Sequence, residues 1–134
     1  MPAIAIEQPS ETDINTIHAV LRETYWSPGI PREVVARACA NSMCAVARDD
    51  AGKLVGFARL VTDKATFAWL CDVIVLPGKQ GKGLGRALVQ TFQRHPELQG
   101  LRRWLDAPAR LRAFNWTMAA LLVVSLYPVL RLKM

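Results

Sequence analysis

The chain has few residues of the kinds that bind metals or cross-link small secreted domains. Its 134 residues include three cysteines, Cys39, Cys44 and Cys71, and two histidines. An odd number of cysteines without metal-ligand spacing argues against a zinc site and against a disulfide framework. The opening MPAIAIEQPSETD also lacks the basic start and long apolar stretch of a secretory signal. We therefore expect no metal, a reducing cytoplasmic location, and Cys39 and Cys44 as small core residues.

Long uncharged runs are also scarce. The longest, FNWTMAALLVVSLYPVL at 114–130, is short for a membrane-spanning helix, which needs about 20 apolar residues. Asn115 and Pro128 weaken that interpretation further. A helix over about 108–121 followed by a core strand is the preferred prediction, so no membrane partner is expected.

What the chain does contain is a globular composition with an excess of positive charge. Hydrophobic residues make up 51% and charged residues 21%, which favours one folded domain over residues 1–134. The net charge of +6 favours an anionic partner such as a phosphorylated cofactor, a nucleic acid or an acidic membrane. Because the basic residues are dispersed along the chain, nucleic acid is the less favoured partner.

Hydrophobic periodicity predicts the element order strand, helix, helix, strand, strand, strand, helix, strand. Ser10 or Asp13 can cap the first helix, and DDAGK at 49–53 is a typical hairpin turn. This order predicts an α/β (α+β) fold, a three-layer α/β/α sandwich around a mixed, mostly antiparallel sheet. The predicted strands cover 3–7, 43–50, 53–63, 66–77 and 100–107, and the predicted helices cover 10–26, 31–42 and 85–95.

A glycine-crowded basic turn separates the third long apolar run from the last helix. Residues 75–85 read VLPGKQGKGLG and hold four of the eight glycines. Glycines let backbone N–H groups approach a ligand, and a helix that begins near Gly83 adds unpaired N–H groups and its positive dipole end. Gln80, Lys82 and Arg86 add donors and charge. The turn therefore predicts a pyrophosphate site.

Two common phosphate motifs do not fit this turn. A Walker A loop needs Lys-Ser/Thr after its second glycine, whereas Leu84 and Gly85 follow Gly83. A Rossmann fingerprint needs a third glycine that GKGLGR lacks. Both motifs also belong to parallel βαβ units rather than to hairpins.

A third pattern, Gln/Arg-x-x-Gly-x-Gly/Ala between a strand and a helix, matches residues 80–85. With DVIVLPGK before it, this segment resembles the acetyl-coenzyme A signature of the GNAT superfamily of N-acetyltransferases. The segments TYWSPGIPREVV, VGFARLVTDKATFAWLCDVIVLP and HPELQGLRRWL resemble one bacterial branch of it. The resemblance covers about residues 3–105, roughly three quarters of the chain.

The resemblance implies a division of labour among the cofactor-binding residues. Backbone groups of Val73 and Val75 would pair with the pantetheine arm of acetyl-CoA. The N–H groups of Gly81, Gly83 and Gly85 would hold the pyrophosphate, with Gln80, Lys82 and Arg86 around it. The implied reaction is direct acetyl transfer to a primary amine of a small-molecule acceptor, with the N–H of Val73 or a neighbour stabilising the oxyanion.

The residues for acid–base chemistry and for the acceptor are less sharply indicated. Asp72 is the acid in the strand before the glycine turn, either paired structurally or catalytic. By alternation its side chain points away from Cys71 and Val73, unless a bulge intervenes. Asp63 is a weaker candidate and more typical of a turn, and His18, His95 and Cys71 are poor candidates. Tyr25 and Trp26 lie where GNAT folds shape the acceptor pocket, so they either contact the acceptor or pack in the core or at the helix end. Arg59 either binds an acidic acceptor group or pairs with Asp63 or Asp72.

The chain departs from the family pattern after Leu105. The expected Thr-Arg-Asp-Ala-His-Gly-Leu-Tyr-like stretch, with a tyrosine that protonates the thiolate, is replaced by DAPARLRAFNWTMAALLVVSLYPVLRLKM. The alternative function is therefore a GNAT-fold module that binds coenzyme A without efficient turnover. An apolar surface left by the atypical segment 108–134 would favour a homodimer.

Overall fold

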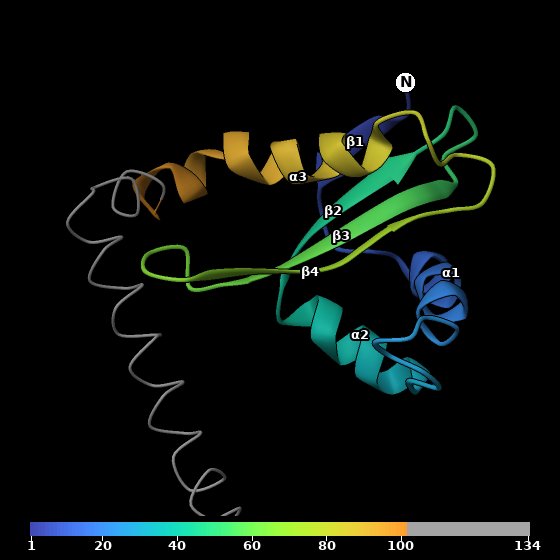
Figure 1. The fold of residues 1–134 in the computed structure, drawn as a ribbon. Coiled ribbons are helices and arrows are strands. Elements are labelled where there is room, and N and C mark those ends of the chain that lie inside the picture. Colours follow the sequence, from blue (N-terminus) through green and yellow to red (C-terminus); the bar gives the residue numbers. More distant parts are fainter. Residues whose placement is uncertain (102–134) are drawn as a thin grey trace, which may run out of the picture.

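The computed structural model describes residues 1–101, which form a four-stranded sheet with helices on both faces (Figure 1). The elements in chain order are β1 (Ala3–Ile6), α1 (Glu11–Leu21), α2 (Arg32–Ala40), β2 (Met43–Arg48), β3 (Leu54–Thr62), β4 (Ala68–Val75), α3 (Leu84–Arg94) and the 3₁₀ helix η1 (Pro96–Leu98). This order confirms the predicted sequence of strands and helices as far as the third helix.

The sheet is antiparallel, and its strand order β1-β2-β3-β4 follows the chain. The predicted hairpin turn at 49–53 joins β2 to β3. There the Asp49 N–H donates to the Lys53 carbonyl at 2.9 Å, and Gly52 adopts a positive φ of 80°. The turn forms because glycine tolerates this left-handed backbone and because Asp49 also accepts from the backbone of Ala51 and Lys53.

Two hydrophobic layers cover the sheet from opposite sides (Figure 1). On one face, α1 and α2 pack on Val46, Phe57 and Ile74. On the other face, α3 buries Leu84, Leu88 and Phe92, the residues that helical spacing predicts to share a face. These layers confirm the three-layer α/β fold class. Cys39 and Cys44 are buried free thiols in the first layer, as predicted.

The face beneath α3 is built from unusually small residues. Ala45 and Ala47 of β2 and Ala58 of β3 are fully buried there. Gly56 lies among them, and a Cβ at this position would stand 3.1 Å from Leu84 Cδ2 and 3.2 Å from Leu88 Cδ1. Leucine side chains of α3 therefore occupy the space that a larger residue would take.

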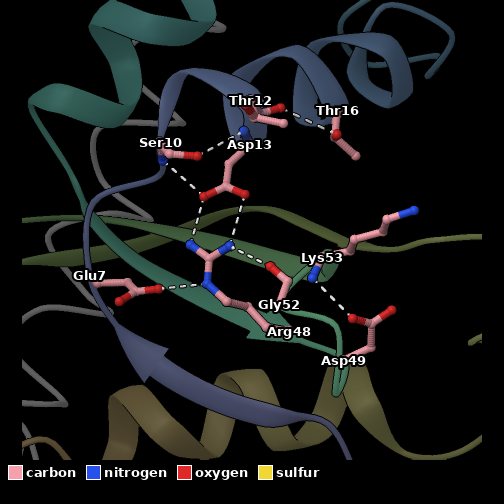
Figure 2. Close-up of polar contacts among 9 residues, drawn as sticks. All are labelled: Glu7, Ser10, Thr12, Asp13, Thr16, Arg48, Asp49, Gly52 and Lys53. Carbon is pink, nitrogen blue, oxygen red and sulfur yellow. Dashed lines mark hydrogen bonds and ion pairs between the residues drawn. The ribbon is translucent and has the colours of Figure 1, made fainter.

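The start of α1 is fixed by an arginine–carboxylate cluster around the buried Asp13 (Figure 2). Ser10 caps the helix and exchanges two hydrogen bonds with Asp13, so both predicted capping residues take part. Arg48 of β2 donates to both Asp13 oxygens at 2.9 and 2.6 Å and to Glu7 at 2.9 Å. The hydrogen bonds from Arg48 hold the pKa of the Asp13 carboxyl below its usual range.

Two sequence predictions differ from the structure at element ends. The first helix ends at Leu21 rather than near residue 26, because the chain turns there and the Thr24 hydroxyl donates to the Leu21 carbonyl at 2.7 Å. Residues 100 and 101, predicted to open a strand, are helical, in continuation of the turn that begins with Pro96. The rest of that predicted strand and the predictions for 108–134 lie outside the described residues. Within residues 1–101, no helix is long and apolar enough to cross a bilayer.

Candidate functional site

The glycine turn between β4 and α3 has an open, left-handed backbone. Gly78, Gly81 and Gly83 have φ values of 83°, 77° and 79°. A Cβ at any of the three would meet nothing within 4 Å, so the turn does not need these glycines for packing. It needs them for the positive φ, and their exposed backbone leaves room for a ligand to approach closely. The turn thus has the shape of an anion cradle.

The start of α3 adds positive potential to this cradle. Gly83 caps the helix without a side-chain hydrogen bond, and the first turn holds no acidic residue. The exposed side chains of Lys82 and Arg86 flank it. Lys79 and Lys82 also line a hollow beside Leu84 and the chain's first two residues. An uncapped helix N-terminus beside three cationic side chains is a favourable place for a pyrophosphate.

Gly85 differs from the other three glycines. It lies inside α3 with an ordinary helical backbone, and a Cβ there would be 3.8 Å from side-chain carbons of Val73 and Val75. That distance is normal van der Waals contact. Alanine therefore fits at this position, in agreement with the Gly/Ala choice at the end of the motif.

Val73 and Val75 of β4 carry the backbone groups predicted to meet the pantetheine arm. Among the described residues β3 is the single strand beside β4, and the Leu76 N–H donates to Val55 of β3 at 3.0 Å. By alternation the N–H group of Val75 points to the opposite edge, whereas Val73 adjoins an interruption of the β3–β4 ladder. The Gln80 side chain donates to the Val75 carbonyl at 3.0 Å, so Gln80 ties the glycine turn to β4.

Asp72 lies in a bulge of β4. Phe57 pairs with Ile74 and Arg59 pairs with Cys71, so β4 has one more residue than β3 in this interval. Asp72 has a φ of 51° and turns its carboxylate toward Arg59, whose Nε donates to Oδ2 at 2.8 Å. The bulge left open by sequence alternation is present, and Arg59 pairs with Asp72 rather than with Asp63.

Tyr25 and Trp26 form an exposed aromatic pair after α1. Their ring centroids are 5.0 Å apart in an edge-to-face arrangement, and Tyr25 is 90% exposed. The Trp26 indole donates to Asp72 Oδ1 at 3.2 Å. The structure therefore brings three of the predicted residues together, Trp26, Arg59 and Asp72, and joins Tyr25 to them through Trp26.

The weaker acid–base candidates have structural partners. Asp63 accepts hydrogen bonds from Thr66 and the backbone of the β3–β4 turn, which lower the pKa of its carboxyl. His18 Nε2 lies 2.9 Å from the Ile30 carbonyl, and His95 Nδ1 accepts from the Glu97 N–H at the start of η1. Cys71 is a free, half-buried thiol.

Two residues of this region are not evident from sequence spacing. Ser42 accepts from Arg59 Nη1 at 3.1 Å and donates to the Ala38 carbonyl at 2.7 Å. Gly56 gives α3 room to approach the sheet. Gly56 does leave a signal in the sequence other than spacing, since a glycine inside an apolar strand marks close approach of a neighbouring element. Ser42 has none, because its partner depends on the pairing of β2 with β3.

The comparison with protein families now identifies the class. The acetyltransferase (GNAT) family profile matches residues 12–115, which include the glycine turn, the β4 bulge and the aromatic pair. The chain belongs to the GNAT family of acetyltransferases, as the motif at 80–85 predicts.

Solved structures of this family are similar to the chain. A GNAT-family protein from Xanthomonas campestris pv. campestris is 42% identical, with a TM-score of 0.67 over 76% of this chain and 72% of that chain. The diaminobutyrate acetyltransferase EctA from Paenibacillus lautus, solved with L-2,4-diaminobutyric acid and coenzyme A, is 14% identical. Its TM-score is 0.56 over 76% of this chain and 63% of that chain, which shows a shared fold.

The curated relatives are longer than this chain and less similar to it in sequence than the Xanthomonas protein. Histone acetyltransferase TAP1 of Glycine max is 29% identical over 102 residues, which are 68% of this chain and 44% of the relative. Acetyltransferase FG08082 of Gibberella zeae is 28% identical over 111 residues, 69% of this chain and 62% of the relative. The chain thus spans less than two thirds of the length of either.

Proposed function

We propose that the protein transfers the acetyl group of acetyl-CoA directly to a primary amine of a small-molecule acceptor. The observation that carries this proposal is the glycine turn. Three open, left-handed glycines lead into an uncapped α3 between Lys79, Lys82 and Arg86. Membership of the GNAT family agrees with this reading of the turn.

In the proposed complex the turn and β4 hold the two ends of the cosubstrate. The N–H groups of Gly81, Gly83 and Gly85 and the side chains of Lys82 and Arg86 bind the pyrophosphate. Backbone groups of Val73 and Val75 pair with the pantetheine arm. Gln80 keeps the turn against β4 through its hydrogen bond to Val75, so both contacts share one rigid frame.

Acetyl transfer forms a carbon–nitrogen bond while the carbon–sulfur bond of the thioester breaks, and the amine loses a proton while the thiolate gains one. When bound, acetyl-CoA supplies the activated acyl carbon. The chain positions the acceptor beside the aromatic pair Tyr25 and Trp26 and offers the Val73 N–H to the carbonyl oxygen. Asp72 lies at this point of β4, in an ion pair with Arg59 of β3.

A second candidate function is supported by the sequence after Leu105, where the family's tyrosine-bearing stretch is replaced. In that case the glycine turn would bind coenzyme A, and the protein would act as a binding module with little turnover. The two functions agree on the cofactor site and differ in amine-dependent release of free coenzyme A.

The test is calorimetric titration of acetyl-CoA into the full chain and three variants. Gly83→Trp places a large side chain on a left-handed residue in the cradle, and we expect its affinity to fall at least about tenfold. Gly29→Trp makes the same change at a left-handed, uncrowded glycine between α1 and α2, and should bind normally. Gly85→Ala should also bind normally, because its Cβ fits against Val73 and Val75.

A panel of tyramine, spermidine, glucosamine and lysine then separates the two functions by release of free thiol. Amine-dependent release supports the transferase, and binding without release supports the binding module. Both candidate functions would be contradicted by a folded chain that does not bind acetyl-CoA. They would also be contradicted if Gly29→Trp and Gly83→Trp lost affinity for acetyl-CoA equally.

A further inference from the structure

We infer that Arg59 is a positioning residue that holds the bulge of β4 and the acceptor-side Trp26 in one arrangement, through the carboxylate of Asp72. The inference rests on the proposed function for its kinetic consequence. Its structural part concerns four side chains, Trp26, Ser42, Arg59 and Asp72, which come from four different segments of the chain.

The first step is the backbone of the bulge. Asp72 sits at a φ of 51°, a left-handed conformation that few residues other than glycine adopt readily. Aspartate and asparagine tolerate it better than most, but the bulge still interrupts the pairing of β3 with β4. Such a backbone persists only when surrounding contacts hold it. The contacts here come from the Asp72 side chain.

The second step is how fully Asp72 and Arg59 are engaged. Their side chains are 11% and 18% exposed, so the ion pair lies largely out of water. Arg59 Nε donates to Asp72 Oδ2 at 2.8 Å, and Nη1 donates to Ser42 Oγ at 3.1 Å. Ser42 in turn donates to the Ala38 carbonyl at the end of α2. The planar guanidinium thus joins β4 to the α2–β2 junction, which the flexible ammonium of a lysine would not do equally well.

The third step connects the pair to the acceptor side. Asp72 Oδ1 accepts from the Trp26 indole at 3.2 Å, so both carboxylate oxygens have a donor. Trp26 itself is 48% exposed and packs edge-to-face on the more exposed Tyr25. A change at Arg59 therefore reaches an exposed aromatic surface that Arg59 does not touch, through one carboxylate.

The competing role for Asp72 is that of the base that accepts the amine proton. The two roles predict different consequences for Asp72→Asn. Asparagine tolerates the left-handed backbone and can still accept from Trp26, but it cannot take up a proton or form the ion pair. A base would lose at least about a hundredfold in kcat, together with the acidic limb of the pH profile. A positioning residue would lose affinity for the acceptor and keep that limb.

The experiment combines NMR with steady-state kinetics on the full chain. The Trp26 indole resonance, assigned with Trp26→Phe, is followed in wild type, Arg59→Gln and Asp72→Asn. We expect the Trp26 resonance to shift in Arg59→Gln. It should not shift in the control Arg22→Gln, because the ion pair of Arg22 with Glu23 is exposed. Thermal melting identifies any variant that fails to fold, and Arg59→Gln/Asp72→Asn, which leaves no unpaired charge, is then used in its place.

For the most active amine of the panel, Arg59→Gln and Asp72→Asn should each raise the acceptor KM about three- to tenfold, with a smaller change in kcat. The double variant should be no worse than either single one, because both changes break the same contact. An unchanged Trp26 resonance in Arg59→Gln, or loss of kcat with loss of the acidic limb in Asp72→Asn, would overturn the inference. A wild-type chain without turnover would refute the transferase proposal alone, because the resonance still tests the coupling.

Discussion

At the scale of single residues, Gly56 sets how closely α3, and with it the end of the glycine turn, approaches the sheet. Its hydrogen atom faces the leucines at the start of α3, and α3 begins directly after the glycine turn. A side chain here would press on Leu84 and Leu88 at distances that leave no free space. The position of the glycine turn is therefore coupled to a residue of β3, outside the turn itself.

We expect Gly56→Val to destabilise the protein by about 1–3 kcal/mol, because overpacking displaces α3 from the sheet. The same displacement should weaken binding of acetyl-CoA, and Gly56→Ala should show both effects to a smaller degree. Chemical denaturation and calorimetry measure the two effects. Gly85→Ala is the matched control, since its Cβ finds ordinary contact distances. Wild-type stability and affinity in Gly56→Val would refute this account of the α3 interface.

The sequence predicts contacts that follow from regular spacing within one element, but not those that depend on how two strands pair. Leu84, Leu88 and Phe92 repeat at helical spacing, so their shared face was predictable. The contact of Arg59 with Asp72 was one of several open alternatives, because it depends on a bulge that alternation cannot locate. The role of each side chain in acceptor binding stays a prediction.

At the scale of elements, α1 is attached to the sheet by more than its apolar face. Its capping box is a local feature, and Ser10 and Asp13 were readable as caps. Arg48 is the last residue of β2 and pairs with Ala3 of β1, and its side chain reaches the Asp13 carboxylate in the first turn of α1. The helix start, Glu7 just after β1 and the β2–β3 hairpin thus share one guanidinium, which also donates to the Gly52 carbonyl at 3.3 Å. Local sequence predicts the cap, and strand register supplies its partner.

Asp13→Asn should lower the free energy of unfolding by about 1–3 kcal/mol near neutral pH, because it removes the buried carboxylate that accepts two charged hydrogen bonds from the partly exposed Arg48. Folding lowers the pKa of Asp13 below its unfolded value of about 3.9. The ionised Asp13 therefore stabilises the fold above that pH, and this stabilisation is lost as the pH falls through the lower pKa of the folded state. Urea denaturation at about pH 7 and about pH 3 measures the difference between wild type and variant, which should shrink in acid.

The control for that experiment is Glu11→Gln. Glu11 also pairs with an arginine, Arg32, at 2.6 Å, but its side chain is 87% exposed. Solvent screens such a pair, so its removal should change stability little at either pH. An equal effect of the two substitutions would show that burial of the Asp13 cluster is not what makes it important.

At the scale of the whole molecule, the net positive charge and the glycine turn both favour an anionic ligand. The chain carries 17 basic and 11 acidic residues, and Lys79, Lys82 and Arg86 gather around the turn. Coenzyme A is strongly anionic, so the field of the protein favours its approach before any specific contact forms.

We expect the affinity for coenzyme A to fall roughly three- to tenfold when sodium chloride rises from about 0.05 M to about 0.5 M, because salt screens exposed charges. Calorimetry at the two concentrations gives the ratio. Lys82→Gln should reduce that ratio, whereas Lys53→Gln, which removes an exposed charge from the β2–β3 turn, should reduce it less. An affinity that does not respond to salt would assign recognition to the backbone N–H groups alone.

The strand order described above has a consequence for how this chain reaches its fold. Because β2, β3 and β4 are neighbours both in the sheet and in the chain, their pairing closes two short loops and needs no crossover. Local contacts of this kind form quickly, since little chain entropy is lost in bringing the strands together. The glycine turn and α3 come later in the chain and dock on β4 and on the small-residue face that this meander creates. A nascent chain can therefore assemble the platform for the proposed cofactor site before it contains the residues of that site.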